Sequence, residues 1–162
     1  MPDRDDVYVM RVFARSPAVP SPQAIADHLL RQRFIVRIES GVFSLSYENW
    51  HHLHLFYASG RAPLSLERQS LHGDAPLPER LRALMDATAD AKASRGKRRV
   101  LDFLAQSSQV FELIIPPDFD WHAGRHLIST ELLNYLQKET DGLIQADEEG
   151  YYKRNQLILK LA

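Results

Sequence analysis

Residues 7–14, VYVMRVFA, are rich in β-branched and aromatic side chains and predict a β-strand close to the start of the chain. A proline-rich loop follows, and Ser21 then stands as the N-cap of a helix that has Pro22 at its first position. Beyond this helix, three further strands are predicted by FIVRIES (34–40), HHLHLFYA (51–58) and PLSLERQ (63–69). The last two flank Gly60 and are typical of a hairpin.

After a helical segment that joins the two parts, the second part of the chain repeats this order of strand, helix and strands. A helical segment over residues 78–105 comes first, and Gly96 in the basic run KASRGKRR predicts a break or an exposed turn within it. QVFELIIPP (109–117) then predicts a strand, and Asp120 is the cap of a helix that runs roughly to Lys138. GLIQA (142–146) and QLILKLA (156–162) predict the closing strands.

These elements predict one α+β domain over residues 1–162, with a largely antiparallel sheet and helices packed on one face. Segments 7–70 and 109–162 read as pseudo-repeats of a strand–helix–strand–strand unit, joined by the helices of 78–105. At this level the chain resembles the tandem strand–helix–strand–strand proteins, such as the gyrase-inhibitory-protein-like family and the effector-binding domains of multidrug-responsive regulators. The resemblance covers nearly the whole chain in pattern alone, and it implies a pseudo-twofold cleft that binds small molecules without changing them.

Composition excludes several classes of protein. The 162 residues carry a formal net charge of −1, which does not favour nucleic acid or an anionic membrane as a partner. There is no cysteine, so disulfides, thiol nucleophiles and thiolate metal sites are excluded. The N-terminus does not have the pattern of a signal peptide, and no apolar run approaches the roughly 20 residues of a membrane span. We therefore expect a cytoplasmic protein.

The acidic stretch ETDGLIQADEEGYY (139–152) has the composition of a calcium loop but not its spacing. An EF-hand needs oxygen ligands at alternate positions, whereas apolar residues follow Asp141 where such ligands are required. We interpret Gly142 as the stop of the preceding helix and DEEG (147–150) as a turn between strands.

Histidines provide the strongest candidate metal ligands. His52 and His54 are two apart and share one face of a predicted strand, and His122 and His126 are four apart on a predicted helix. If the two pairs converged, they would form a site for zinc or another divalent metal. The alternative is four partly exposed surface histidines, and this is the interpretation that we prefer, so no cofactor is expected.

Catalytic patterns are absent from the sequence. There is no nucleophile elbow and no glycine-rich phosphate loop, and Asp118 and Asp120 are the nearest approach to paired carboxylates. The basic run at 92–99 has no aromatic residue for base stacking, which favours a solvated turn over a phosphate or acidic-partner site.

We therefore expect a binding or regulatory module and not an enzyme. Its site should lie between the two halves and take a small hydrophobic or cationic ligand, with ring contacts from Trp50, Tyr57, Trp121 and Tyr152. Tyr151 and Tyr152 are adjacent in a strand and must point to opposite faces. Two alternatives stay open: an inhibitor-type or immunity-type protein that binds a protein partner, and a divalent-metal-dependent enzyme that uses the histidines.

The two interpretations of the histidines predict different metal contents for the purified protein. We expect no stoichiometric metal by elemental analysis of protein purified without a histidine tag, and a stability change below about 0.5 kcal/mol for His54→Ala. His28→Ala and His72→Ala are the controls. Metal in equal proportion to protein, lost in His54→Ala alone, would establish the metal site, with Asp118 or Asp120 as the general base to test.

Overall fold

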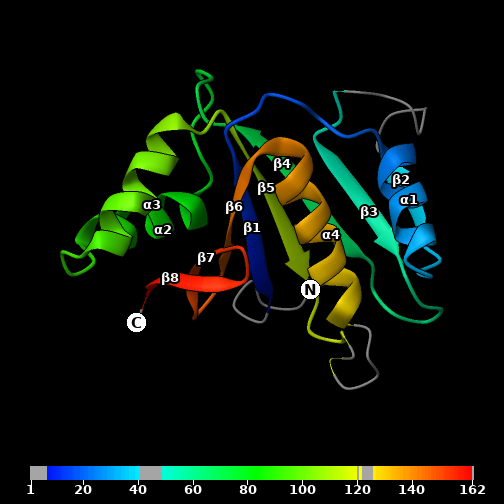
Figure 1. Ribbon diagram of the computed structural model, residues 1–162. Coiled ribbons are helices and arrows are strands. Elements are labelled where there is room, and N and C mark those ends of the chain that lie inside the picture. Colours follow the sequence, from blue (N-terminus) through cyan, green and yellow to red (C-terminus); the bar gives the residue numbers. More distant parts are fainter. Residues whose placement is uncertain (1–6, 41–48, 120, 122–125, 162) are drawn as a thin grey trace.

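The computed structural model describes residues 7–40, 49–119, 121 and 126–161, with the backbone alone at His126 (Figure 1). The strands are β1 (Tyr8–Ala14), β2 (Arg37–Ser40), β3 (His52–Phe56), β4 (Leu64–Ser70), β5 (Gln109–Ile115), β6 (Gly142–Ala146), β7 (Gly150–Lys153) and β8 (Gln156–Lys160). The helices are α1 (Pro22–Arg31), α2 (Glu79–Asp90), α3 (Arg95–Gln106) and α4 (His126–Thr140).

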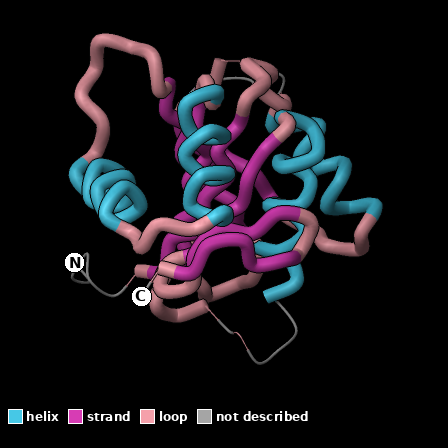
Figure 2. Tube along the Cα trace, turned by 60° about the vertical axis from the view of Figure 1, so that its left-hand side comes forward, coloured by secondary structure: helices cyan, strands magenta, loops and turns pink. Residues whose placement is uncertain are grey.

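All eight strands join one sheet in the order β2-β3-β4-β5-β1-β6-β7-β8. Every neighbouring pair is antiparallel, which confirms the predicted α+β class and the antiparallel sheet. The N-terminal strand β1 lies in the interior, paired with β5 along its whole length and with β6 over Met10–Ala14. Figure 2 shows the strands gathered at the centre of the molecule with the helices around them.

Helices α1 and α4 lie together on one face of the sheet, as the sequence predicts. Ser21 caps α1, and its side chain accepts a hydrogen bond from the backbone N–H of Ala24 at 3.1 Å. The apolar sides of both helices pack on alternate residues of the strands to form the larger core. Its members include Val12, Leu53, Leu66, Phe111 and Leu113 from strands and Ile25, Leu29, Leu132 and Leu136 from helices.

The intervening strand residues contact α2 and α3 instead. Phe13, Val110, Leu143 and Tyr151 alternate with members of the larger core and form a second cluster with apolar residues of these two helices. Tyr151 is fully buried there, whereas Tyr152 packs against the larger core, so the two rings point to opposite faces as predicted. The sheet thus carries a second, smaller apolar layer.

The predicted duplication of a strand–helix–strand–strand unit stays unconfirmed. The strand expected at Tyr151 and Tyr152 is β7 and is separate from β8, so both segments contain one helix and four strands. Their connections differ, however. Helix α1 leads to the outermost strand β2 and the chain returns inward to β4, whereas α4 leads to the inner strand β6 and the chain proceeds outward to β8. Equal composition of elements therefore does not produce equal topology.

Two glycines serve close packing and not helix termination. The prediction that Gly142 ends the preceding helix is wrong, because α4 ends at Thr140 and Asp141 adopts the positive φ of 52°. A Cβ on Gly142 would overlap the Val12 side chain. The break near Gly96 lies instead at residues 91–94, and Gly96 sits in the first turn of α3, where a Cβ would overlap the carbonyl of Ile158 on β8.

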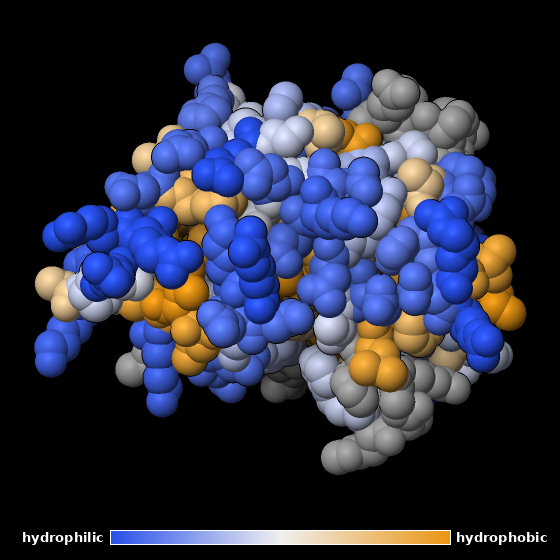
Figure 3. All heavy atoms as spheres, in the orientation of Figure 1, coloured by the Kyte–Doolittle hydropathy of each residue, from blue (hydrophilic) through white to orange (hydrophobic). Residues whose placement is uncertain are grey.

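The surface in Figure 3 is mostly hydrophilic, with apolar residues in small groups. No helix in the described parts of the chain is long and apolar enough to cross a membrane.

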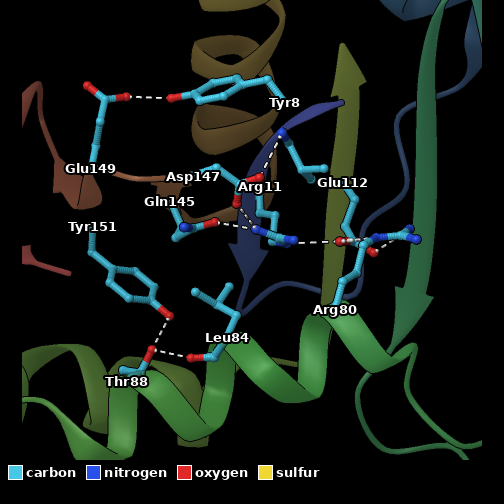
Figure 4. Close-up of polar contacts among 11 residues, drawn as sticks. Tyr8, Arg11, Arg80, Leu84, Thr88, Glu112, Gln145, Asp147, Glu149 and Tyr151 are labelled. Atoms are coloured by element: carbon cyan, nitrogen blue, oxygen red, sulfur yellow. Dashed lines mark hydrogen bonds and ion pairs between the residues drawn. The ribbon is translucent and has the colours of Figure 1, made fainter. Parts of the chain in front are cut away.

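Beneath α2 the sheet buries a row of charged and polar side chains (Figure 4). Arg11 on β1 and Glu112 on β5 are a register pair, and only 2% and 1% of their surfaces are exposed. Arg11 Nε donates to Glu112 Oε2 at 2.8 Å, and its Nη1 donates to Gln145 at 2.7 Å and to Asp147 at 2.9 Å. Arg80, in the first turn of α2, donates to both oxygens of Glu112 at 3.1 Å and to Glu67 at 2.7 Å. The charges thus hold α2 on the sheet.

Neutralising the shared carboxylate tests this arrangement. We expect Glu112→Gln to lower the free energy of unfolding by about 3 kcal/mol, because two arginines lose the negative charge and one of the two acceptor oxygens that they share, and one of these arginines is buried. Urea denaturation measures the change. Glu67→Gln is the matched control, and it should cost less than about 1 kcal/mol because its partly exposed pair is solvated. Equal losses in the two variants would contradict this account.

Candidate functional site

The four aromatic residues predicted to line a site are not all brought together. Trp50 is fully buried in the larger core, where its Nε1 donates to the carbonyl of Pro20 at 2.8 Å. Its ring lies 5.9 Å from that of Phe111 on β5. Trp50 therefore fills the interior and anchors the loop before α1. Tyr57, Trp121 and Tyr152 lie elsewhere, at one end of the sheet.

Two residues that the sequence analysis does not select connect these three. Phe119 lies between Tyr57 and Trp121, with ring centroids 5.3 Å and 4.8 Å away. Trp121, of which 41% is exposed, then makes a T-shaped contact with Tyr8, with ring centroids 5.7 Å apart. Together these four rings form a continuous aromatic row from the β3–β4 loop to the first residue of β1.

The row ends at a carboxylate. Tyr8 donates its hydroxyl proton to Glu149 Oε2 at 2.7 Å, and Tyr152 donates to Glu149 Oε1 at 3.1 Å. Tyr8 and Glu149 are shown in Figure 4. One hydroxyl on each oxygen fixes the orientation of the carboxylate. Since an ionised carboxylate has about four lone-pair sites, capacity remains for a further donor.

Beside this carboxylate is a pocket of about 230 Å³ between α4 and the strands β1, β6 and β7. We call it the Glu149 pocket. Its lining residues are Met10, Thr130, Leu133, Asn134, Ile144, Ala146, Glu149, Tyr152 and Asn155. The walls are mainly apolar, and among the described residues that line it Glu149 is the one charged group. Such a site suits a ligand with an apolar body and a positive charge.

The carboxylate also affects its tyrosine neighbours. Burial raises the pKa of Tyr8 above its ordinary value, and the hydrogen bond and negative charge of Glu149 raise it further. The pKa of Tyr152 is raised by the same causes in the same order. Both hydroxyls therefore stay protonated and keep donating to Glu149 at neutral pH. This arrangement suits binding, and it supplies no activated nucleophile.

Helices α1 and α4, one from each predicted half, contact each other through their side chains. The rings of His28 on α1 and Tyr135 on α4 stack with centroids 4.4 Å apart. His28 Nε2 also lies 3.4 Å from Glu131 Oε2. These contacts occupy the space between α1 and α4 at Tyr135 and Glu131. The Glu149 pocket is lined by other residues of α4, namely Thr130, Leu133 and Asn134.

Of the four candidate metal-binding histidines, the structure describes the side chains of His52 and His54. His52 and His54 do share one face of β3, with ring centroids 4.4 Å apart. Burial lowers the pKa of His52, His54 lowers it further, and Glu67 opposes the shift. Glu67 lies across from His52 in the β3–β4 pairing, but its carboxylate forms an ion pair with Arg80. His122 and the side chain of His126 lie outside the described residues, among which no group of three or more candidate ligands can hold a metal ion.

The other candidate groups have structural contacts. Asp118 accepts a hydrogen bond from the backbone of Ala62 at 3.0 Å, and its carbonyl accepts from Arg61. Asp120 lies outside the described residues. The basic run at 92–99 is placed in the α2–α3 turn and the start of α3, where Lys97 donates to the carbonyl of Ala91 at 2.7 Å.

No known protein-family model, curated protein or solved structure matches this chain. The resemblance to tandem strand–helix–strand–strand proteins therefore stays a prediction.

Removing the charge of Glu149 should change the titration of the tyrosines. In Glu149→Gln we expect the pKa of Tyr8 and of Tyr152 to fall toward the ordinary value, because the charged acceptor is gone. Absorbance at alkaline pH measures this. Glu148→Gln, one residue away, is the control and should leave the titration unchanged. In the native protein the raised values predict stability that is complete below about pH 10 and falls as pH rises from there toward the folded-state values.

Proposed function

We propose that this protein is a non-catalytic small-molecule-binding module, and that its ligand combines a small apolar body with a cationic group. The observation that supports this is the Glu149 carboxylate, oriented by two tyrosine hydroxyls beside an apolar pocket. The apolar body would contact Met10, Leu133 and Ile144, and the cation would meet Glu149.

The rings near Glu149 add to the attraction. Tyr152 lines the pocket, and the ring of Trp121 contacts that of Tyr8, whose hydroxyl binds the same carboxylate. A cation near such rings gains about 0.5–1 kcal/mol at an exposed site. An anionic ligand would instead be repelled by the carboxylate. The arrangement therefore favours cations through two independent interactions, one with the charge of Glu149 and one with the nearby rings.

The size of the pocket limits the ligand. At about 230 Å³ it is smaller than the roughly 300–1,000 Å³ of pockets that hold drug-sized molecules. A single aromatic ring or a short alkyl chain with an ammonium group is the appropriate scale. We propose a cytoplasmic location for the protein because a chain without cysteine fits a reducing compartment.

A protein-binding function is the second candidate. Its support is the set of large apolar side chains that are exposed among the described residues, including Leu30, Ile35 and Leu127. A partner of this kind would protect a broad surface from solvent, whereas a small ligand would protect the Glu149 pocket alone. Hydrogen exchange with and without the ligand therefore separates the two functions.

Three probes that share one ring test the proposal: benzyltrimethylammonium, benzyl alcohol and benzoate. We expect the cation to raise the melting temperature most, since a ligand at 100 times its dissociation constant stabilises by about 2.7 kcal/mol. Glu149→Gln should weaken cation binding by about three- to tenfold, the scale of an exposed ion pair plus a cation–π contact. Ala146→Leu, which fills the pocket, should abolish binding of the cation.

The matched control is again Glu148→Gln, which keeps the net charge of Glu149→Gln but leaves the pocket carboxylate in place. It should bind the cation like the native protein. Equal affinity for all three probes, or no binding of any of them, would contradict the proposal.

A further inference from the structure

The turn after α1 has an arginine where glycine is favoured. The backbone N–H of Phe34 donates to the carbonyl of Leu29 at 2.8 Å, and that of Arg33 donates to Leu30 at 2.9 Å. These are the two bonds of a Schellman motif, whose left-handed residue is usually glycine. Arg33 occupies this position with φ 68°. The fold alone would be served better by glycine, since a Cβ crowds the following carbonyl in this conformation.

The apolar side chains that follow Arg33 are unusually exposed to solvent. Ile35 is 84% exposed, and Phe34 before it is only half-buried. Figure 3 shows apolar residues at the surface over the edge formed by α1 and β2. An exposed cation and an exposed β-branched residue therefore stand side by side in the link from α1 to β2.

These residues line a groove. One hollow of about 280 Å³ lies between this link and α4, and a second of about 550 Å³ continues from it along the β3–β4 loop. Both are lined by Ile35 and Tyr57. We call the two together the Arg33 groove. Its remaining lining residues are Arg33, Phe34, Arg37, Phe56, Ala58, Ser59, Gly60, Arg61 and Ile128.

The charge of the groove is opposite to that of the Glu149 pocket. Arg33, Arg37 and Arg61 line it, and no acidic side chain does among the described residues. Arg37 is paired with Glu39 and stacks over the ring of Phe56 at 4.3 Å. Arg61 donates to the carbonyl of Asp118. Arg33 makes no ion pair with any residue in the described ranges.

We propose that the Arg33 groove is a second binding site, for a small amphipathic organic anion such as an alkyl carboxylate. The apolar body lies on Phe34, Ile35 and Tyr57, and the carboxylate meets the guanidinium groups of Arg33 and Arg61. Guanidinium groups match the two oxygens of a carboxylate in geometry and charge.

Octanoate and octanol, both below the concentrations at which they aggregate, are the probes. Calorimetry should show that octanoate binds at least fivefold more tightly than octanol. In Arg33→Gly the affinity for octanoate should fall by about five- to tenfold, whereas the melting temperature should stay the same or rise, since glycine suits the turn. A merely structural role for Arg33 would not combine these two results.

Arg154→Gly is a matched control, because Arg154 is also exposed and has a positive φ of 51° but lies in the β7–β8 turn. It should bind octanoate like the native protein. Arg61→Gln should weaken octanoate and leave octanol unchanged. The proposal is overturned if octanoate fails to bind, if it binds no better than octanol, or if Arg33→Gly and Arg154→Gly have equal affinities. Neither probe carries a positive charge for Glu149 to attract, so the outcome is independent of the function proposed above.

Discussion

The antiparallel pairing of β1 with β5 is the interaction on which the other layers depend. It joins residues about a hundred positions apart in the chain and sets Arg11 opposite Glu112 and Val12 opposite Phe111. Since side chains alternate along a strand, this one register decides both faces of the central sheet. A slip by one residue would place Arg11 among the apolar side chains beneath α4. The buried ion pair is satisfied only in the native register, and it holds α2 through Arg80.

The same pairing explains why both candidate sites lie at one end of the sheet. Tyr8 begins β1 and is opposite Ile115, where β5 ends, so the chain leaves β5 beside the first residue of β1 and continues to Phe119 and Trp121. The β6–β7 turn reaches the same end, because Asp147 N–H bonds to the carbonyl of Val9. In antiparallel sheets these ends and turns are neighbours without any local sequence signal. Loops on a rigid sheet then carry the chemistry.

Helix positions and strands were largely predictable, because caps, prolines and alternation are local signals. The Ser21 cap and strand β6 agree with prediction residue for residue. Site residues were less predictable. Tyr57, Trp121 and Tyr152 are visible as large rings, but only the fold inserts Phe119 and Tyr8 between them and sets Trp50 apart. The sequence predicts that Glu149 is part of a turn, and this is correct. Nothing in the local sequence shows that two tyrosines converge on its carboxylate.

By itself the sequence determined the class of fold and the identity of most strands and helices, since these follow from local propensity and side-chain periodicity. It also determined the absence of thiol chemistry, because there is no cysteine. Only the tertiary structure decided the strand order, the buried charges and the opposite signs of the Glu149 pocket and the Arg33 groove. Those features depend on which distant segments meet, and the free energy that selects the meeting comes from packing and charge pairing across the whole sheet.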